Sequence, residues 1–491
     1  MVLDPERYYC DHGFTVRMDD TTVDMQNKVF SGRLMSAKID LGFEVYCIFW
    51  GTKAGETKGQ IVLANADREL DVLGEVGMQD RSIEVRVGNV DQHWSDWEVE
   101  FVGIINSSAS FAGDKVMLEV ANIANKLERV FNSWTYAIGD SSIVGENIPR
   151  AIGNAYNVPA LLINRTTPTY ATGGNTLRVR SNGVELLPAQ WTVIANGFDL
   201  LVAPSGRITA DVQSNDSTNN GLDSEILAGF VESILELAGI DPGNRAGMSG
   251  LEALNYTLGF WSQKPVTLES IMDELAASYG GYWFFDNDRN LRIQRLEAPS
   301  GPVFEITDLF FELGKKIERE PDDKPGYSDT CAGRRNWHVN TPNEIANSLT
   351  SPYQQIAAEL QRDYRFRRSG VSPGTPPPPD LIAENEKFDG VKVNQSSGGI
   401  GSLFQEPSDC QSESSRWRAL YSVRRNFYYL PLVDRRDTSA QIRALRPGQT
   451  VAVTAPLEGE KRPFGLVSKN LVVVGLKRQR ENQSILLKVW G

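Results

Sequence analysis

Histidine and cysteine are scarce in this chain of 491 residues. The three histidines are His12, His93 and His338, and the four cysteines are Cys10, Cys47, Cys331 and Cys410. The cysteines form no CxxC pair, which argues against a zinc ribbon and against a disulfide framework. Cys10 and His12 could both contact a metal, but no second pair stands at ligand spacing. An iron–sulfur cluster needs thiolates that meet in space, which four isolated cysteines do not indicate. The sequence therefore predicts no metal and no cofactor.

Long apolar runs are also missing. No stretch approaches the roughly 20 apolar residues that a membrane helix needs. The first residues, from Met1 through the polar segment LDPERYYCDHGF, do not resemble a signal peptide. We therefore expect synthesis in the cytoplasm and no membrane insertion of the chain's own.

Signatures of catalysis are absent as well. The sequence contains no GxSxG and no HExxH, and no cysteine stands in a family-typical order with a histidine. GTKAGETKG (51–59) lacks the Gly-Lys-Ser/Thr of a phosphate loop and precedes a strand pattern. Carboxylates are abundant, but no pair is singled out for glycosidase chemistry. We predict that the protein is not an enzyme and has no catalytic residues.

Charge is unevenly distributed. The net charge is −13, and residues 1–100 hold 10 Lys/Arg and 19 Asp/Glu, a net −9 that leaves −4 for the rest. An acidic segment repels nucleic-acid phosphates, so reading of DNA sequence is disfavoured. A passage through which DNA must slide without sticking remains compatible with it.

Short strands dominate what is present, and the length fits about three domains. Residues 1–145 read as an antiparallel barrel or sandwich, with one helix predicted in NIANKLERVF from Ile123, Leu127 and Val130. In SIEVRVG, Ile83, Val85 and Val87 are expected to face one way, and Glu84 and Arg86 the other.

Residues 146–213 read as a small β module. The sequence IPRAIGNAYNVPALLI (148–163) has a Gly-Asn turn and a proline near each end, which favours two short runs over one element. Pro159 is expected to stop the first run and to keep Asn157 and Val158 extended. Asn182-Gly183 and Asn196-Gly197 each predict a hairpin turn.

Residues 214–300 change to an α+β pattern. After the linker SNDSTNNG, a helical stripe is formed by Ile226, Leu227, Phe230, Val231, Ile234 and Leu235. A second helix is expected to begin at the N-cap Thr267 and to end at Gly280-Gly281, burying Leu268, Ile271, Met272, Leu275 and Tyr279. YWFFDNDRNLRIQRL then predicts a hairpin.

Strands return over residues 301–491, as in PGQTVAVTAP, LVVVGLKRQ and SILLKVWG. A helix is predicted at 352–364. A polar insert at about 370–415 contains Pro376 to Pro379, which favour polyproline II, and we expect it to be an exposed arm that contacts another protein.

Three residue groups have a functional and a plainer interpretation. Asp286, Asp288, Asn290 and Glu297 stand at calcium-loop spacing, but Leu291 occupies the glycine position, so an ordinary Asp/Asn turn is favoured. Trp50, Trp94 and Trp97 could form a sugar or partner platform, although core packing is favoured. The basic strip RRNFYYLPLVDRRD (424–437) interleaves aromatics as single-strand binders do, yet a subunit contact, shared with Arg334 and Arg335, fits an acidic chain better.

A resemblance accounts for these pieces in order. IVLANADRELDVL (61–73), followed by SIEVRVG, WEVEFVGII and KVMLEVANIANKLE, resembles the N-terminal domain of tail-tip and baseplate hub proteins of tailed phages. IPRAIGNAYNVPALLI with ITADVQ is similar to the next segment of siphophage tail proteins. PVTLESIMDELAASYGGYWFFDNDRNLRIQRL resembles a module shared with contractile-tail hubs and late-control proteins. SDTCAGRRNWHVN and VVVGLKRQRENQSILLKVWG are similar to the second tube-like domain of such hubs.

The resemblance implies a mainly β, multi-domain fold with a smaller α+β part. It comprises two tube-like β-barrel domains (1–145 and 301–491), the small β module (146–213) and the α+β helix–hairpin domain (214–300). It implies a homotrimeric structural protein of the virion tail baseplate, joining the tail tube or distal tail protein to tip and fibre proteins. Tape measure protein and transiting DNA would occupy its channel, with Glu84 among the acidic lining. A tail-associated cell-wall hydrolase and a receptor-binding adhesin are the alternatives.

Overall fold

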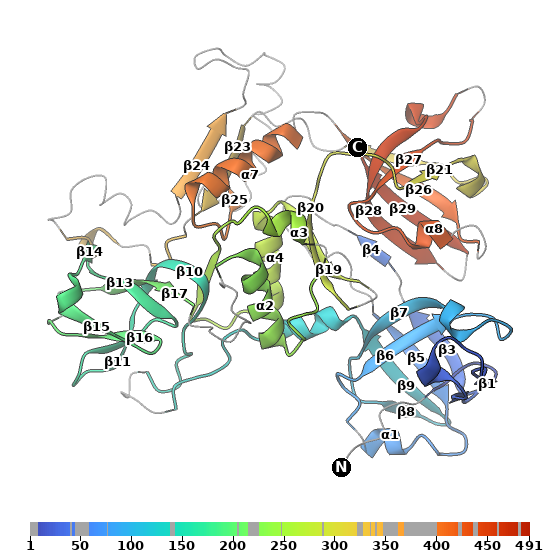
Figure 1. Cartoon of the computed structure of the whole chain (residues 1–491), viewed down its shortest axis with the longest axis horizontal. Helices are drawn as coiled ribbons and strands as arrows, with labels where there is room; N and C mark the ends of the chain where they lie inside the picture. The colour runs from blue at the N-terminus through green and yellow to red at the C-terminus, as the bar shows by residue number, and fades with distance from the viewer. Residues whose placement is uncertain are drawn as a thin grey trace.

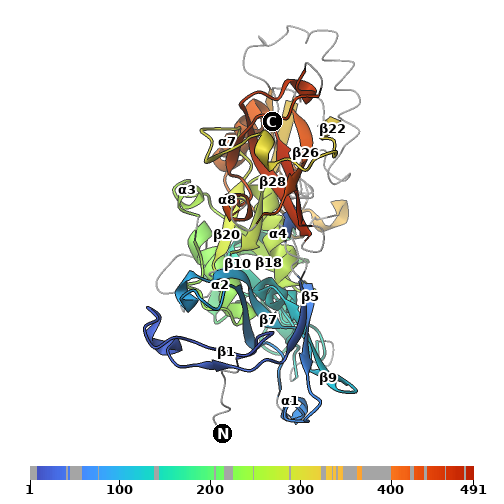
Figure 2. The same ribbon diagram turned by 90° about the vertical axis from the view of Figure 1, so that its right-hand side faces the viewer.

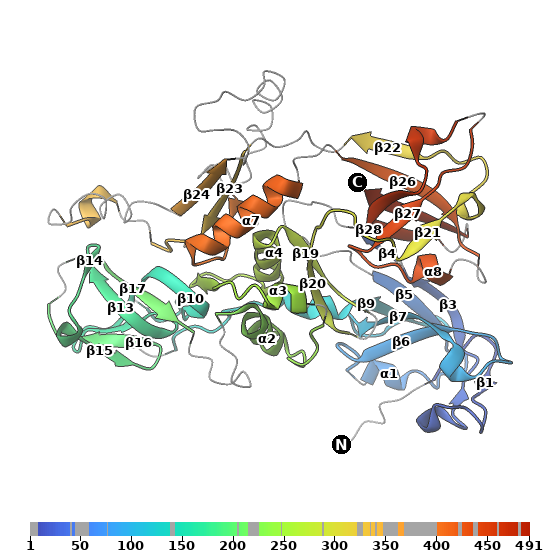
Figure 3. The same ribbon diagram turned by 45° about the horizontal axis from the view of Figure 1, so that its top comes forward.

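The structure is a computed structural model. It describes residues 8–39, 42–44, 58–75, 77–137, 143–203, 206–214, 225–246, 248–286, 289–321, 328–333, 335–338, 341–346, 362–367, 400–420, 425–435, 440–458, 461–479 and 483–491. Figures 1 and 3 show a small β module at one end, two larger β parts at the other, and helices between them. No helix among these residues is long and apolar enough to cross a membrane.

The first large β part, which we call the N unit (residues 8–121), is one curved antiparallel sheet with a short arm. The sheet order is β3 (Leu34–Ile39), β5 (Lys58–Ala64), β9 (Lys115–Ala121), β7 (Glu98–Ile105) and β6 (Ser82–Val87), and β8 (Ser110–Ala112) also pairs with β9. Alternating β-branched and leucine side chains such as Ile61, Leu63, Val116 and Leu118 bury one face. The arm precedes β3 and carries β1 (Phe14–Thr15), η1 (Val23–Met25) and β2 (Val29–Phe30). A short helix, α1 (Val72–Glu75), follows β5.

The second large part, the C unit (residues 303–321 and 425–491), is also a single sheet. Its order is β21 (Phe304–Ile306), β27 (Thr450–Val453), β28 (Lys469–Gln479), β29 (Ser484–Trp490), β26 (Asn426–Val433) and β22 (Glu318–Pro321). Valine and leucine side chains on one face form its core, with Leu471, Val473, Leu487 and Val489 fully buried. Short helical turns η5 (Asp308–Phe310), α8 (Ala440–Arg443) and η7 (Pro463–Gly465) flank the strands.

The two units share one strand order. The succession β3-β5-β9-β7-β6 in the N unit has the same chain order and antiparallel pairing as β22-β26-β29-β28-β27 in the C unit. In each unit the long connection lies between the first strand and its neighbour: residues 40–57 in one and 322–425 in the other. Both ends of the chain therefore repeat one β arrangement, whereas closure into tube-like barrels, and the domain limits at 145, 213 and 300, stay predictions.

The small β module packs two sheets face to face. One sheet has the order β14 (Val184–Glu185), β13 (Asn175–Ser181), β17 (Ile208–Gln213), β10 (Arg150–Pro159) and β18 (Gly259–Ser262). The other has β11 (Leu161–Asn164), β12 (Thr169–Ala171), β16 (Gly197–Leu200) and β15 (Trp191–Ile194), with η4 (Pro188–Gln190) before it. Asn182-Gly183 forms the predicted turn, with φ of 49° and 80°. At the other hairpin Gly197 already pairs with Ile194, so the turn is Ala195-Asn196, one residue earlier than predicted.

The segment IPRAIGNAYNVPALLI follows the prediction at Pro159, which ends one strand before β11 begins at Leu161, but differs from it at Gly153-Asn154 and at Asn157. Residues Arg150–Pro159 form the single strand β10, which pairs with β18 through its first half and with β17 through its second. Asn157 is not extended but left-handed, with φ of 51°, at a bulge where the register shifts. A bulge can contain a left-handed residue. Pro159 has no backbone N–H to donate to a neighbouring strand, and it stands at the last position of β10, where such a residue is tolerated.

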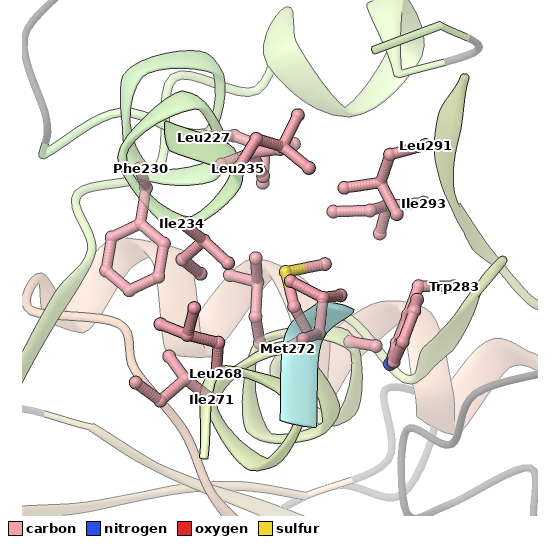
Figure 4. Close-up of a cluster of buried hydrophobic side chains, with 14 of the residues drawn as sticks. Leu227, Phe230, Ile234, Leu235, Leu268, Ile271, Met272, Trp283, Leu291 and Ile293 are labelled. Atoms are coloured by element: carbon pink, nitrogen blue, oxygen red, sulfur yellow. The ribbon is translucent and has the colours of Figure 1, made fainter. Parts of the chain in front are cut away.

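The central module (residues 225–296) holds the largest core. α2 (Leu227–Ala238) and α4 (Leu268–Ser278) bury the predicted stripes against the hairpin β19 (Gly281–Phe285) and β20 (Leu291–Arg295). The exception is Ile226, which is the N-cap of α2 and is only half-buried. Figure 4 shows Phe230 and Ile234 of α2 close to Leu268 and Ile271 of α4, with Met272 between this group and Trp283 of the hairpin. The Thr267 side chain caps α4 by accepting from the amide of Ser270, as predicted. α3 (Ser249–Glu252) completes the module.

The connection between β22 and β26 leaves the C unit and packs on this centre. It contains β23 (Ser328–Gly333), η6 (Pro342–Glu344), β24 (Arg362–Arg367), β25 (Ile400–Gly401) and α7 (Pro407–Leu420). The predicted helix 352–364 lies largely outside the described residues, but its last residues belong to β24 and are not helical. Pro376–Pro379 also lie outside them. The end of the predicted exposed insert is core instead, since Leu403, Phe404 and Cys410 are buried in the central cluster.

Two smaller predictions for the N unit need correction. The segment at Ile123 is a 3₁₀ helix, η3 (Ile123–Glu128), which buries Ile123 and Leu127 but leaves Val130 outside it and 41% exposed. The register between β6 and β7 shifts after Val85, because Glu100 of β7 is an extra residue with no partner on β6. Beyond this bulge Val87 is 37% exposed, so it does not share the burial that the alternation predicts for Ile83, Val85 and Val87.

Candidate functional site: a charged joint between the terminal sheets

The N unit and the C unit meet through a donated strand. β4 (Gly42–Glu44) lies between β3 and β5 in the sequence, yet it pairs antiparallel with β28 of the C unit, Leu476 opposite Phe43. β27 pairs only with the first part of β28, up to Val472. The later part of β28 is therefore completed by a strand from the other end of the chain.

Beside this strand lies a group of five charged side chains. Arg443 ends α8, Arg478 lies on β28 and Asp434 directly follows β26, all in the C unit. Glu98 and Glu100 lie two residues apart on β7 of the N unit, and both side chains reach arginines of the C unit. Figure 1 shows α8 and β28 immediately above the N unit.

The five charges form a continuous chain of ion pairs. Arg443 donates to both oxygens of Glu98, at 2.9 and 3.0 Å, and to Asp434 at 2.9 Å. Arg478 donates to Glu100 at 2.7 Å and also to the second oxygen of Asp434. Asp434 thus bridges the two arginines, and each arginine holds one glutamate of the other unit.

Burial makes this network matter energetically. The side chains of Arg443, Asp434 and Glu100 are 6%, 5% and 3% exposed, whereas Glu98 is 45% exposed. Burial alone would lower the pKa of Arg443, but hydrogen bonds and charge from Glu98 and Asp434 outweigh it, so the pKa is raised. Breaking a buried pair of this kind costs about 3–5 kcal/mol, because the remaining charge stays buried without its partner.

The opposite charges that meet at the joint reflect the opposite net charges of the two ends of the chain. Residues 421–491 hold 13 Lys/Arg and 5 Asp/Glu, a net +8, against the −9 of residues 1–100. Opposite net charges favour association of the two surfaces and oppose alternative pairings. The arrangement is that of a structural contact, which holds two sheets of one strand order side by side.

The C unit is fastened to the central module as well. Tyr282, Phe284 and Leu296 of the hairpin pack against Val472 and Trp490, and Leu420 at the end of α7 joins them. A side chain at Gly448 would meet the Tyr282 hydroxyl at 2.3 Å, so the sheets approach closely here. Three contacts therefore hold the C unit: β4, the ion pairs and this apolar cluster.

α7 is anchored by a buried carboxylate. Glu413 is fully buried and accepts from Arg295 at 2.9 Å, from Arg416 at 2.8 Å and from the Tyr256 hydroxyl at 3.3 Å. Burial and the Glu413 charge raise the pKa of Tyr256 to about 12. Arg416 also donates to the carbonyls of Tyr279 and Leu296, which ties the helix to the hairpin.

The described members of the calcium-like set, Asp286, Asn290 and Glu297, have separate partners. Asp286 accepts from the amide of Asn290 at 2.9 Å and pairs with Arg292, while Glu297 pairs with Arg295. Asp288 lies outside the described residues. The favoured Asp/Asn turn therefore accounts for the described members of this set.

The cysteines and histidines are scattered. The sulfur of Cys10 accepts from the amide of Gly13 at 3.1 Å, while His12 is exposed beside Asp11. His93 lies 3.8 Å from Asp20, and His338 lies 3.6 Å from Glu344. Among the residues that the structure describes, no three His, Cys, Asp or Glu side chains gather to hold a metal.

Trp94 and Trp97 pack with other rings. The two rings lie 5.1 Å apart, Phe14 lies 4.9 Å from Trp97, and Phe30 lies 5.0 Å from Trp94. Arg86 covers another part of the Trp94 ring at 5.0 Å. These rings fasten the arm to the N unit, in line with the favoured packing role; Trp50 lies outside the described residues.

The basic strip is divided among several contacts. Arg425 stacks on Trp490 at 4.6 Å, Asp434 is the bridge of the joint, and Arg443 a few residues later belongs to it too. Arg335, grouped with the strip, pairs instead with Glu274 of α4 at 2.7 Å. Arg334, Arg424 and residues 436–437 lie outside the described part. Sequence spacing could not reveal the joint, because Glu98 and Arg443 are 345 residues apart.

Asn157 forms a second long-range contact that the sequence does not reveal. Its side-chain amide donates to Asn336 Oδ1 at 2.7 Å and to the carbonyl of His338 at 2.8 Å. Trp337, between these two residues, packs against both the central core and the core of the small module. The bulge therefore directs the Asn157 side chain to a segment that we call the strap (residues 335–338 and 341–346). The strap contacts both the small module and the centre.

The sequence matches no protein-family model and no curated protein sequence. Three solved structures are similar along most of the chain. The tail protein from Neisseria meningitidis MC58 has 11% identity and a TM-score of 0.37, over 93% of this chain and 91% of that one. The 43 kDa tail protein of prophage MuSo2 from Shewanella oneidensis has 9% and 0.36, over 94% of each chain. A chain in the virion of the native gene transfer agent particle has 14% and 0.41, over 75% of this chain and 91% of that one.

Proposed function

We propose that this protein is a structural component of a phage tail, and specifically its tail-tip or baseplate hub. The observation that carries the proposal is the pair of sheets with one strand order, held side by side by β4 and by the ion pairs of Arg443 and Arg478. A chain built this way offers the same β surface twice. Three such chains would bring six similar sheets around one axis and enclose a channel.

The ordered resemblance in the sequence supports the same proposal from an independent direction. It covers most of residues 55–300 and parts of 325–491, so it includes both units. In this proposal the hub is a homotrimer that joins the tail tube or distal tail protein to the tip and fibres, and it belongs to the virion tail. It performs no reaction of its own.

The charge of the N unit suits a channel for DNA. Asp67, Glu69, Asp71 and Glu75 are exposed around α1 at the end of the sheet, and Arg33 pairs there with both Asp67 and Glu69. With Arg33 and Arg68 counted against the four carboxylates, this end keeps a net −2, whereas Glu84 on β6 is balanced by its pair with Arg86. The acidic contribution to the channel is therefore proposed to come mainly from this end and less from the strand face around Glu84. Negative charge there repels DNA phosphates, so DNA that follows the tape measure protein through the channel forms no tight ion pairs with its wall.

Image reconstruction of intact tails tests the proposal. We expect three copies of the chain around the tail axis, with the N units meeting the channel and a negative potential at its wall. A monomer on the outer surface of the tail, or a positive channel wall, would rule out the hub. Hydrolysis of purified peptidoglycan by the chain, lost on substitution of one carboxylate, would favour the hydrolase alternative instead.

A further inference from the structure

The small β module stands at one end of the molecule, away from the N and C units. Figure 1 shows it at the left-hand end, and in Figure 2, turned by 90°, it lies behind the other parts. Two separate contacts join it to the rest of the described structure. One, which we call the root, is the place where β10 and β17 connect to the central module, and the other is the strap. A module held at two distant places keeps its angle only while both contacts hold.

The root consists of two chain crossings that lie side by side. β10 pairs with β18 of the central module up to Gly153 and with β17 from Asn154 onwards, so the chain passes from one module to the other between these residues. β17 ends at Gln213, and the amide of Ser214 donates to the carbonyl of Gly153 at 2.8 Å. Asn154 and Gln213 both donate to Glu225, the first residue of the central module. Two adjacent crossings form a hinge, since a module can turn about the line that joins them.

Glycines occupy the root where the backbone is left-handed. Gly153 and Gly173 have φ of 66° and 84°. Beside Gly173, the indole of Trp261 on β18 donates to the carbonyl of Thr172 at 2.8 Å and keeps the two modules attached. Glycine changes φ at the least steric cost, and hinges consist of a few residues that absorb such changes. The root therefore combines attachment with the conformational freedom that a turn requires.

The strap contacts the opposite end of the same sheet. The amide of Ala346 donates to the carbonyl of Asn182 at 3.1 Å, in the turn that follows β13. β13 begins beside Gln213 of the root and comprises seven residues, so at about 3.3 Å per residue this contact lies roughly 20 Å from the root. Nearer the root, the amide of Trp337 donates to the carbonyl of Tyr156 at 3.3 Å. A contact so far from the hinge opposes any turn of the module.

The polar groups of the strap are only partly satisfied. Three of its contact atoms are buried without a hydrogen-bond partner among the described residues, namely Asn157 Oδ1, Trp337 Nε1 and His338 Nε2. A buried polar group of this kind costs about 1–3 kcal/mol. The cost opposes the gain from packing of Trp337 against the central core and the core of the small module. The closed strap is therefore a contact of small net stability, which one added charge can open.

A proton on His338 adds such a charge. Arg207, directly before β17, repels a positive ring, whereas Glu344 of η6 attracts it from 3.6 Å. Burial and Arg207 outweigh Glu344 and lower the pKa of His338, so the closed strap favours the neutral ring. Two further ion pairs adjoin the strap and are neutral as a whole, Arg180 with Asp211 at 2.6 Å and Arg335 with Glu274 at 2.7 Å.

We propose that the strap is an acid-released latch on a hinged module. With His338 neutral, the strap fixes the small module against the centre; with His338 protonated, the strap separates and the module turns about the root. The contacts of the root persist during the turn. Every group in this device belongs to one chain, so it holds independently of the proposed tail function.

Hydrogen exchange of the full chain at about pH 7.5 and about pH 5 tests the latch, with each rate divided by the intrinsic rate at the same pH. The amides of Trp337 and Ala346 should lose protection at least tenfold at the lower pH, while the amide of Ser214 at the root keeps it. His338→Gln should keep the strap closed at both pH values. Asn157→Gly, which retains a left-handed backbone but loses both hydrogen bonds to the strap, should open it already at the higher pH.

The matched control is Asn196→Gly. Asn196 is another left-handed asparagine of the small module, with φ of 58°, in the turn between β15 and β16. This variant should behave as the wild type does at both pH values. Small-angle X-ray scattering of the same samples measures the turn, and the radius of gyration should change wherever the strap opens and nowhere else.

Several results would overturn the proposal. The latch is wrong if Trp337 and Ala346 keep their protection at the lower pH, or if Ser214 loses protection together with them. The hinge is wrong if the strap opens and the scattering stays the same. The trigger is wrong if His338→Gln opens as the wild type does. None of these results bears on the place of the chain in a tail, which image reconstruction decides separately.

Discussion

At the scale of the residue, Arg478 is the side chain on which the joint depends most. It joins Glu100 of the N unit to Asp434 of the C unit, and both carboxylates are almost fully buried. Arg478→Met keeps much of the side-chain volume but leaves two buried charges without this partner. We expect the free energy of the unfolding transition that separates the two units to fall by about 3–5 kcal/mol.

Calorimetry and chemical denaturation measure this effect. The matched control is Arg17→Met, which removes an exposed pair with Asp19, and surface pairs of that kind contribute little. If Arg478→Met lowers the free energy of unfolding no more than the control does, the ion pairs of the joint are screened by solvent as surface pairs are.

Asn157 offers a finer comparison, because its backbone and its side chain can be tested separately. Asn157→Gly keeps a residue that accepts φ of 51° and removes two hydrogen bonds to the strap, at a cost of about 1–3 kcal/mol. Asn157→Ala removes the same bonds and adds a left-handed alanine, which costs roughly 1–2 kcal/mol more. Equal stability of the two variants would contradict the assigned backbone strain.

The residues of the joint and of the strap were beyond prediction from the sequence, for a physical reason. Glu98 on a strand, or an asparagine before Val-Pro, has the same local pattern whether it faces water or a residue hundreds of positions away. The helix stripes of α2 and α4 were predictable, since periodic burial is written into consecutive residues. The end of β10 at Pro159 was predictable, but its continuity through Gly153 and Asn157 was not, because these residues signal turns locally while pairing with β17 and β18 decides the outcome.

At the scale of the element, a substitution in β4 tests whether this strand is a hydrogen-bonded part of the C unit's sheet. Phe43→Pro removes a backbone donor and restricts the strand, so β4 should detach. Hydrogen exchange should then lose protection at those amides of Gly475, Leu476 and Lys477 that point to β4, since alternate amides of β28 point to β29 instead. The amide of Val473, which donates to the carbonyl of Gln449 just before β27, is the internal control and should keep its protection. Loss of protection along all of β28 would mean that β4 supports the whole sheet and not its end alone.

The strap is expected to respond to pH. Burial and the nearby charge of Arg207 lower the pKa of His338 from its ordinary value of 6.5, and Glu344 opposes this only in part. The unfolded chain therefore takes up the proton more readily, so stability from neutral His338 is complete above about pH 6.5 and declines as the pH falls through the lowered value.

His338→Gln removes this titration while keeping a polar side chain. Thermal unfolding of wild type and variant should differ progressively between pH 7 and pH 5, with the wild type losing more. Parallel curves over this range would assign the pH response to groups other than His338.

At the scale of the whole molecule, assembly should reflect the charge separation. The proposed homotrimer brings the acidic N unit of one chain near the basic C unit of another, and salt screens such contacts when they are exposed. Sedimentation velocity should show a trimer at low ionic strength that weakens towards 1 M salt. The buried joint within each chain should persist under the same conditions. A chain that stays monomeric at every salt concentration would require another protein to assemble it.

The excursion of the chain between β22 and β26 has a mechanical consequence. α7 lies in the chain between β22 and β26, two strands of the C unit, and Glu413 and Arg416 anchor this helix to the hairpin of the centre. Separating the C unit from the centre therefore also strains the contacts of α7. A force that pulls the C unit away from both the centre and the N unit would load α7, the apolar cluster and β4 together. We expect these contacts to break in one event in a single-molecule pulling experiment, and not one after another.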